Sequence, residues 1–354
     1  MEYATKTIFA ARDKKGAIEA AAQEIKNGGI VVFPTETVYG LGADAKNSAA
    51  VDKIFIAKGR PQDNPLIVHI ADVSQLDEIV KNVNEKAQKL MDAFWPGPLS
   101  IIFEKMDCIP NNVSAGLKTI AVRMPKNEIA REIIRKSGQP IAAPSANTSG
   151  KPSPTQAKHA YEDLCGRVPL IIDGGICEVG VESTVVDVTG EVPVILRPGD
   201  ITIEMMEKVV GAVRLHSSIT SGQLLKKDAQ PSAPGMKYKH YSPNAQVIVF
   251  DGDKIEVEKS IKCMYDLYRA KGKSAEVVCL EECAAQYAQC KVAVIGKNAK
   301  QAAAALFTTL RDADELKIDI ILFHMQEKMG LAVKNRIIKA AGNQVITVKE
   351  EKID

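Results

Sequence analysis

The chain has 354 residues, of which 45% are hydrophobic and 25% charged, and its formal net charge is +2 at pH 7. This composition is typical of a globular protein with two domains or one large one, and it argues against a disordered chain. Because the net charge is so small, attraction to nucleic acid or to a membrane would have to come from a local patch.

The sequence carries no signal for a membrane span or for export. No apolar run approaches the ~18–20 residues that cross a bilayer, and residues 1–12 lack the charged-then-apolar layout of a signal peptide. The seven cysteines are scattered, with no Cys-x-x-Cys pair. They fit reduced thiols better than a disulfide framework or a zinc site, so we expect a cytoplasmic protein without membrane contacts.

The first half of the chain alternates helical and extended patterns. Apolar residues at helical spacing predict helices over 14–26 and 48–58, and 73–94 predicts one or two more. Short apolar runs predict strands at 30–33, 65–70, 99–103, 119–124, 140–143, 170–172, 183–188 and 192–196. Helices interleaved with many short strands indicate a layered α/β domain.

Residues 216–244 differ in composition from both flanks. They are poor in large aliphatic residues, contain three prolines, and carry four lysines against one aspartate. This composition predicts a basic connection between domains. Loops longer than ~12–15 residues are usually functional or disordered, so a segment of this length is more than a turn.

From residue 245 the alternation becomes more regular. Strands are predicted at 247–250, 276–280, 292–295 and 318–323, and helices at 256–269, 299–311 and 331–341. Strands separated by helices of this length indicate a small parallel sheet of Rossmann-like winding. The common nucleotide and hydrolase fingerprints are missing, namely G-x-x-x-x-G-K-[ST], G-x-G-x-x-G after the first strand of this region, H-E-x-x-H and G-x-S-x-G.

Polar residues gather in four stretches of the first domain, at 34–42 (PTETVYGLG), 58–69 (KGRPQDNPLIVH), 119–125 (TIAVRMP) and 142–150 (AAPSANTSG). The first and fourth follow predicted strands, where α/β sheets bind small ligands, although each also reads as an ordinary loop. In the third, Thr119, Ala121 and Arg123 share one strand face, which lines either a ligand site or solvent.

The second stretch places two cations beside a glycine at a predicted helix end. Lys58 and Arg60, with Asn64 and His69 nearby, would suit a triphosphate whose charge must be neutralised. Taken alone, however, cations that complement the helix C-terminus are the commoner arrangement. His69 by itself would more often be a core histidine.

Together these stretches form a recognisable set. In order, PTETVYGLG, KGRPxxNPLIVH, WPGPLS, TIAVRMP, APSANTSGKPSPT, ESTVVD and ILRPG closely resemble the YrdC-like domain. The motif SAPGMKYKHYSP (232–243), followed by a Rossmann-like pattern, is similar to the two-domain form of the threonylcarbamoyl-AMP synthase family. The resemblance implies a YrdC-like twisted open α/β sheet domain (8–205), a basic linker or lid over the active site (216–244) and a smaller Rossmann-like parallel α/β domain (245–354).

The resemblance also implies an activity. Members of this family form L-threonylcarbamoyladenylate and pyrophosphate from L-threonine, bicarbonate and ATP. The product serves N6-threonylcarbamoyladenosine modification of tRNA next to the anticodon, through hand-over to the tRNA threonylcarbamoyltransferase complex. Mg²⁺ would come with ATP, because no dense carboxylate cluster offers protein ligands.

Individual residues take roles from the matched motifs. Lys58 and Arg60 are implied as catalytic residues that hold the ATP phosphates. The residues implied to bind ATP are Lys58, Arg60, Asn64, Thr119, Ser145, Asn147, Ser153, Arg197, Tyr241 and His240. Those implied to bind L-threonine are Thr37, His69, Arg123, Ala143 through its backbone, and Ser183. Arg123 would pair with the threonine carboxylate.

Three other classes remain as alternatives. A module that only binds RNA is disfavoured by the small net charge and few aromatics, although weak RNA binding stays open. A hydrogenase-maturation carbamoyltransferase would carry Cys-x-x-Cys zinc motifs, which are absent from this sequence. An amino-acid sensor that uses the second domain is harder to exclude. Pyrophosphate release with ATP and threonine would separate the enzyme from all three.

Overall fold

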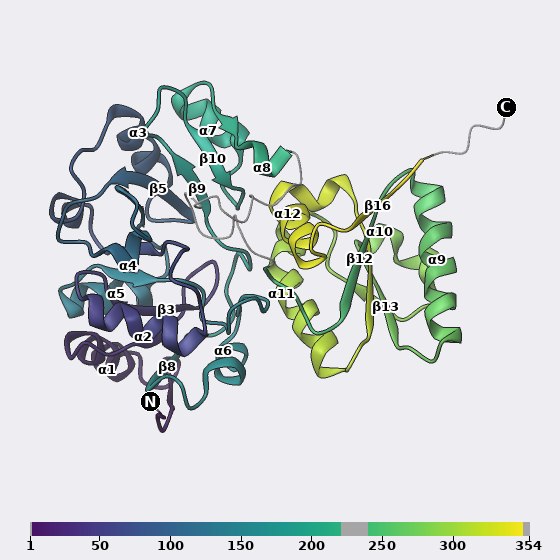
Figure 1. Cartoon of the computed structure of the whole chain (residues 1–354), viewed down its shortest axis with the longest axis horizontal. Helices are drawn as coiled ribbons and strands as arrows, with labels where there is room; N and C mark the ends of the chain where they lie inside the picture. The colour runs from purple at the N-terminus through teal and green to yellow at the C-terminus, as the bar shows by residue number, and fades with distance from the viewer. Residues whose placement is uncertain (1, 221–239, 350–354) are drawn as a thin grey trace. The chain divides into compact units, whose positions relative to one another are not determined.

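The computed structural model describes residues 2–220 and 240–349, and it divides into two compact units (Figure 1). Unit 1 comprises Met1–Ser149 and Ser153–Tyr238, and unit 2 comprises Gly150–Pro152 and Lys239–Asp354. Most of the predicted linker, residues 221–239, lies outside the described residues. Among the helices of the described ranges, none is long and apolar enough to span a bilayer.

Unit 1 is built on a mixed eleven-stranded sheet with the order β1-β8-β2-β3-β7-β4-β6-β5-β9-β10-β11. Its strands are β1 (Lys6–Phe9), β2 (Val31–Phe33), β3 (Gly40–Asp44), β4 (Ile67–His69), β5 (Leu99–Glu104), β6 (Thr119–Arg123), β7 (Ile141–Ala143), β8 (Leu170–Asp173), β9 (Thr184–Asp187), β10 (Val194–Arg197) and β11 (Arg214–Leu215). Its helices are α1 (Lys14–Lys26), α2 (Ser48–Lys58), η1 (Val73–Glu78), α3 (Glu85–Phe94), α4 (Asn111–Ser114), α5 (Glu128–Ser137), α6 (Ala157–Leu164), α7 (Ile203–Val210) and α8 (Ser217–Thr220).

Helices cover the two faces of this sheet unequally. On one face, apolar residues of α2, α3, α4, α6 and α7 form a single core with Val32, Val68 and Val122. On the other face, α1 and α5 pack against Val31 and Phe33 of β2 and their neighbours. Neighbouring strand residues such as Val31 and Val32 enter different cores because side chains alternate across a strand.

A third, smaller hydrophobic cluster lies on the part of the second face that α1 and α5 do not cover. Its buried members are Ile67, Ile102, Ala121, Val185 and Leu196, all from strands. His69 and Arg123 are register partners in the parallel pair β4/β6. Because residues two apart on a strand share a face, they lie on the same face as Ile67 and Ala121. This part of the sheet therefore carries polar residues beside a small apolar cluster.

The sequence predicted most of these elements, with one notable miss in the first polar stretch. The predicted helices 14–26 and 48–58 match α1 and α2, and 73–94 separates into η1 and α3. The stretch 34–42, treated as a loop, ends instead in strand β3, which pairs antiparallel with β2. A Cβ at Gly42 would lie 2.6 Å from Phe33 and from Ile141 side-chain atoms. Local propensity disfavours glycine in strands, but here close packing of large neighbours requires it. Strand β1 was also missed.

Unit 2 contains the predicted parallel sheet, with five strands in the order β14-β13-β15-β12-β16. Its strands are β12 (Gln246–Gly252), β13 (Ala275–Cys279), β14 (Val292–Val294), β15 (Ile320–His324) and β16 (Val345–Val348), the last not predicted. Its helices are α9 (Lys254–Ala270), α10 (Glu281–Ala284), η2 (Ala285–Tyr287), α11 (Ala299–Glu315), η3 (Glu327–Met329) and α12 (Gly330–Ala340). The Rossmann-like winding expected for the second domain is thus confirmed.

Candidate functional site

The loop between β2 and β3 is held by backbone hydrogen bonds to two distant segments. Val179 N donates to the Glu36 carbonyl at 2.8 Å, and Gly180 N to the Thr37 carbonyl at 3.1 Å. Tyr39 N donates to the Pro154 carbonyl at 2.8 Å. Residues 34–39, 154 and 179–180 therefore meet at one end of the sheet, and their backbone polar groups are paired there.

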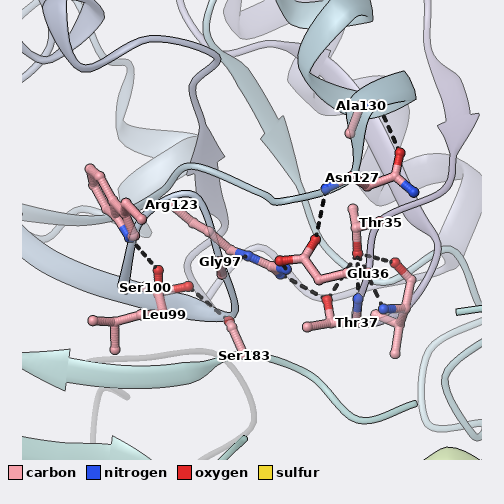
Figure 2. Close-up of polar contacts among 12 residues, drawn as sticks. Thr35, Glu36, Thr37, Gly97, Leu99, Ser100, Arg123, Asn127, Ala130 and Ser183 are labelled. Carbon is pink, nitrogen blue, oxygen red and sulfur yellow. Dashed lines mark hydrogen bonds and ion pairs between the residues drawn. The ribbon is translucent and has the colours of Figure 1, made fainter. Parts of the chain in front are cut away.

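Arg123, at the end of β6, is the centre of the polar contacts at this place (Figure 2). Its Nε donates to the Gly97 carbonyl at 3.1 Å and its Nη1 to Thr37 Oγ1 at 2.8 Å. Its Nη2 forms an ion pair with Glu36 Oε1 at 2.6 Å. A guanidinium has five N–H groups. The three contacts account for three of them, which leaves one N–H on each terminal nitrogen.

The hydroxyl of Thr37 belongs to a directed chain of hydrogen bonds. Thr35 Oγ1 donates to the Val38 carbonyl at 2.6 Å, which uses its only proton. Thr37 Oγ1, 2.9 Å from Thr35 Oγ1, must therefore be the donor of that contact. Since Thr37 Oγ1 also accepts from Arg123, its orientation is fixed on both sides.

Glu36 is a buried carboxylate that sequence reasoning did not select. Only 4% of its side chain is exposed, as for Arg123. Its Oε2 accepts from the backbone N of Asn127, the N-cap residue of α5, at 3.4 Å. Burial alone raises the pKa of the Glu36 carboxyl, but the Arg123 charge, its contact and backbone N–H groups outweigh burial and hold the pKa below its usual value. Glu36 is therefore ionised at neutral pH.

His69 lies beside Arg123 on the neighbouring strand β4. Its Nδ1 is 3.1 Å from the Ile67 carbonyl oxygen, a contact that requires a proton on Nδ1. Burial, and next to it the positive charge of Arg123, lower the pKa of His69 to about 3. The imidazole is consequently neutral at physiological pH.

Ser183 connects two other polar side chains at the start of β9. Arg197 donates from Nε to the Ser183 carbonyl at 3.0 Å and from Nη2 to Ser183 Oγ at 3.1 Å. Ser100 Oγ lies 2.8 Å from Ser183 Oγ. All three residues are buried. The structure thus joins Ser183, predicted for threonine, to Arg197, predicted for ATP, and adds Ser100, which was not predicted.

Lys58 ties the end of α2 to the fourth polar stretch. Gly59 ends the helix in the left-handed conformation (φ 59°), which suits glycine and turns the chain away after Lys58. Lys58 Nζ donates to the Ser145 carbonyl at 2.5 Å and to the Asn147 carbonyl, and Ser149 N donates back to the Lys58 carbonyl. These contacts reach a different loop rather than the last carbonyls of its own helix.

Arg60, which follows Lys58 after the turn at Gly59, also contacts backbone carbonyl groups. Arg60 Nη2 contacts the carbonyls of Asn64 and Pro65 at 3.3 and 3.4 Å. The Asn64 side chain is buried, and its Oδ1 has no hydrogen-bond partner. Buried acceptors are normally satisfied, so this atom fits a donor supplied by a ligand. Ser153 Oγ donates to Glu182, a second carboxylate that was not predicted.

Two further predicted residues lie on the sheet. Thr119 begins β6 and shares a face with Arg123, as the alternation predicted. Ala143, in β7, is buried and pairs with Ile67 of β4.

His240 and Tyr241 belong to unit 2, whereas the other predicted site residues belong to unit 1. Their rings are 5.5 Å apart. The Tyr241 ring lies 5.1 Å from the Phe307 ring, and the Arg336 guanidinium is 5.9 Å from the Tyr241 ring centre. Within unit 2, Tyr241 is therefore packed between an aromatic ring and a cation.

The residues missed by sequence reasoning had weak local signals. Glu36 lies inside a motif that was noted for its threonines, and Ser100 interrupts a buried apolar strand. A buried arginine requires an anionic or carbonyl partner, so the prediction of Arg123 inside the sheet could have prompted a search for Glu36. Across the described residues, histidine, cysteine and carboxylate side chains form no group that could hold a metal ion.

The fold and these contacts define an α/β protein of two compact units, the first of which contains a buried arginine, buried hydroxyl groups and a buried amide oxygen without a hydrogen-bond partner. A family model described as "Telomere recombination" matches residues 23–199, and one described as "Threonylcarbamoyl-AMP synthase, C-terminal domain" matches residues 201–342. The chain is 45% identical to the threonylcarbamoyl-AMP synthase of Pyrococcus abyssi, over 95% of this chain and 97% of that one.

Two further comparisons agree. The threonylcarbamoyl-AMP synthase of Bacillus subtilis is 46% identical over 93% of this chain and 94% of its own. The crystal structure of P. abyssi Sua5 complexed with L-threonine superposes with a TM-score of 0.89 at 44% identity, covering 97% of this chain and 99% of that one. The chain belongs to the threonylcarbamoyl-AMP synthase family, whose members are nucleotidyltransferases that act in tRNA modification.

The buried, neutral His69 predicts a pH dependence of stability. Between the ordinary pKa of 6.5 and about 3, the unfolded chain binds a proton at His69 that the folded chain does not. Stability therefore falls as the pH is lowered through this window, by roughly 2 kcal/mol from this group between pH 7 and 5. Urea unfolding of the unaltered chain and of His69→Gln at both pH values measures it. The variant should lose less stability on acidification, and an equal loss in both proteins would contradict the prediction.

Proposed function

We propose that this chain condenses L-threonine, bicarbonate and ATP into L-threonylcarbamoyladenylate and pyrophosphate. The observation that carries the proposal is the buried Arg123 with two N–H groups left for a ligand, beside Thr37, on a chain of this family. A planar guanidinium with two such groups suits the carboxylate of a small amino acid. L-Threonine is the ligand in the similar P. abyssi structure.

Threonine would be held by side chains that the structure already fixes. Arg123 would take its carboxylate, and the hydroxyls of Thr37 and Ser183 would lie beside it. His69, neutral, would offer hydrogen bonding without a charge. The backbone of Ala143 would complete the contacts. Side chains locked by their own partners hold a substrate without first having to be ordered.

ATP would lie along the second and fourth polar stretches. Lys58 and Arg60 would supply positive charge to the phosphates, and the unsatisfied Asn64 amide would accept a donor from the nucleotide. The remaining predicted contacts are Thr119, Ser145, Asn147, Ser153, Arg197, His240 and Tyr241. The described residues offer no acidic cluster as a metal cage, so Mg²⁺ would be carried by the ATP phosphates.

The reaction depends mainly on how the protein positions the carbamate and ATP. The threonine amine and bicarbonate form a carbamate and water, and a carbamate oxygen then attacks the α-phosphorus while pyrophosphate leaves. The carbamate reverts readily, so the site must hold it in line with the phosphorus and away from water. Phosphoryl-type transfer needs little covalent help from the protein beyond orientation and charge neutralisation. The product would be handed to the tRNA threonylcarbamoyltransferase complex, in the cytoplasm, with RNA binding by this chain weak at most.

The activity itself is the first test. Pyrophosphate release from ATP should require both threonine and bicarbonate. Serine should replace threonine poorly, because losing one methyl costs roughly 1 kcal/mol of apolar burial. Equal ATP turnover with and without threonine would overturn the proposal, whereas RNA binding without turnover would favour the RNA-binding alternative.

The two cations provide the second test. If they neutralise phosphates, Lys58→Ala and Arg60→Ala should each lower turnover by about 10²–10³. Lys53→Ala is a matched control, because Lys53 lies on the same helix and also donates to a backbone carbonyl, that of Gly28. The control should keep normal turnover. If the cations only complement the helix end, Lys58→Ala and Arg60→Ala would show a slightly lower melting temperature and normal activity.

The interpretation of residues 216–244 as a lid is part of this proposal. A plain tether would favour glycine and serine, whereas residues 237–241 combine lysines with aromatic residues. A lid would keep water from the carbamate and the adenylate. Tyr241→Ala should then lower the yield of adenylate per ATP consumed, and Tyr241→Phe, which keeps the ring, should not. If both variants and the unaltered chain give equal yields of adenylate, residues 216–244 only connect the two domains.

A further inference from the structure

The pair formed by Glu36 and Arg123 is enclosed in unit 1, where a buried ion pair is not needed to stabilise the fold. Both side chains are 4% exposed. Removing two charges from water is costly, and apolar residues of similar size often stabilise a fold as well as a buried ion pair does. The apolar clusters on this sheet face show that it accepts such residues. The pair therefore calls for an explanation in the function of the site.

The contacts of Arg123 determine where its guanidinium points. Its acceptors come from two separate segments, the Gly97 carbonyl before β5, and Glu36 and Thr37 in the loop after β2. They engage Nε, Nη1 and Nη2, so all three nitrogens of the planar group are anchored (Figure 2). The plane and both remaining N–H directions are then fixed.

Glu36 is itself anchored on two sides. Its Oε1 faces Arg123 Nη2, and its Oε2 accepts from the backbone of Asn127 at the N-terminus of α5. Its backbone carbonyl accepts from Val179 N. Because Glu36 is held by α5 and by residue 179, its carboxylate holds the guanidinium in a fixed position relative to them.

We propose that Glu36 is the positioning residue for Arg123: it orients the guanidinium toward the substrate carboxylate and balances its charge while the site is empty. This inference rests on the proposed function, in which Arg123 binds the carboxylate of threonine. Glu36 does not touch the substrate. Its contribution should therefore appear in the affinity for threonine, through Arg123, and not in the affinity for ATP.

Two substitutions separate orientation from volume. Glu36→Ala removes both contacts. Glu36→Gln keeps the size, but an amide has only one acceptor oxygen. Whichever way it is turned, its NH₂ group faces a donor, either Arg123 Nη2 or the Asn127 N–H. The glutamine variant thus weakens the contact with Arg123 while keeping the size of the native side chain. It can therefore be measured even if the alanine variant does not fold.

The experiment measures threonine binding by calorimetry and the KM values for threonine and ATP in the full chain. Glu36→Ala should weaken threonine binding about 10- to 100-fold, the range expected for a lost contact to a charged group, and Glu36→Gln by a smaller factor. The KM for ATP should stay within about twofold. Glu276→Gln is a matched control, because Glu276 is a buried glutamate of unit 2 paired with Lys291 at 3.4 Å, and it should change neither value.

A double-mutant cycle tests whether Glu36 acts through Arg123. Glu36→Ala combined with Arg123→Ala should bind threonine no worse than Arg123→Ala alone, since no guanidinium remains to be positioned. Additive losses would overturn the inference, and so would unchanged threonine affinity in both Glu36 variants or an equal loss for ATP. If the unaltered chain binds threonine but releases no pyrophosphate, the proposed function is refuted. The role of Glu36 is tested separately, by the calorimetric comparison of threonine binding.

Discussion

A guanidinium enclosed by protein must be surrounded by acceptors, and this requirement organises one end of unit 1. Arg123 reaches its position on β6 because period-2 alternation turns it to the face opposite Val122. Once there, it needs partners that its own strand cannot provide. The carbonyl of Gly97 and the side chains of Glu36 and Thr37 come from segments far along the chain. The arginine thus ties together two loops that the sheet alone would leave independent.

Arg123 and its acceptors lie where helices α1 and α5 leave the second face of the sheet uncovered. Where α1 and α5 pack on the second face, the strand residues are aliphatic or aromatic. Beyond those helices the same face carries His69, Arg123 and Ser100 beside a small apolar cluster. The other face is packed by helices and forms one large core, which keeps the strands in register. His69, Arg123 and Ser100 therefore lie on the face of these strands that is opposite to the large core.

The sequence could predict what depends on neighbours along the chain. The spacing of apolar residues located α1, α2 and most strands, and a glycine between two cations located the turn after α2. Residue spacing alone could not predict partners that meet only in the fold, and only the family resemblance had grouped Thr37 with Arg123 and Lys58 with Ser145. Thr37 and Arg123 are 86 residues apart, and Lys58 and Ser145 are 87 apart. Strand β3 was missed for a related reason, since its Gly42 is required by the packing of Phe33 and Ile141 and not by local preference.

The neutral state of His69 has a consequence for how the reaction must begin. Threonine in water is mostly an ammonium ion, and only the free amine can attack a carbonyl carbon. A histidine whose pKa is about 3, and whose Nδ1 proton is held by the Ile67 carbonyl, is too weak a base to remove that proton. The free amine must then be supplied by a group other than His69. His69 would then act as a neutral hydrogen-bonding group that holds the carbamate in place, and not as the base that helps to form it.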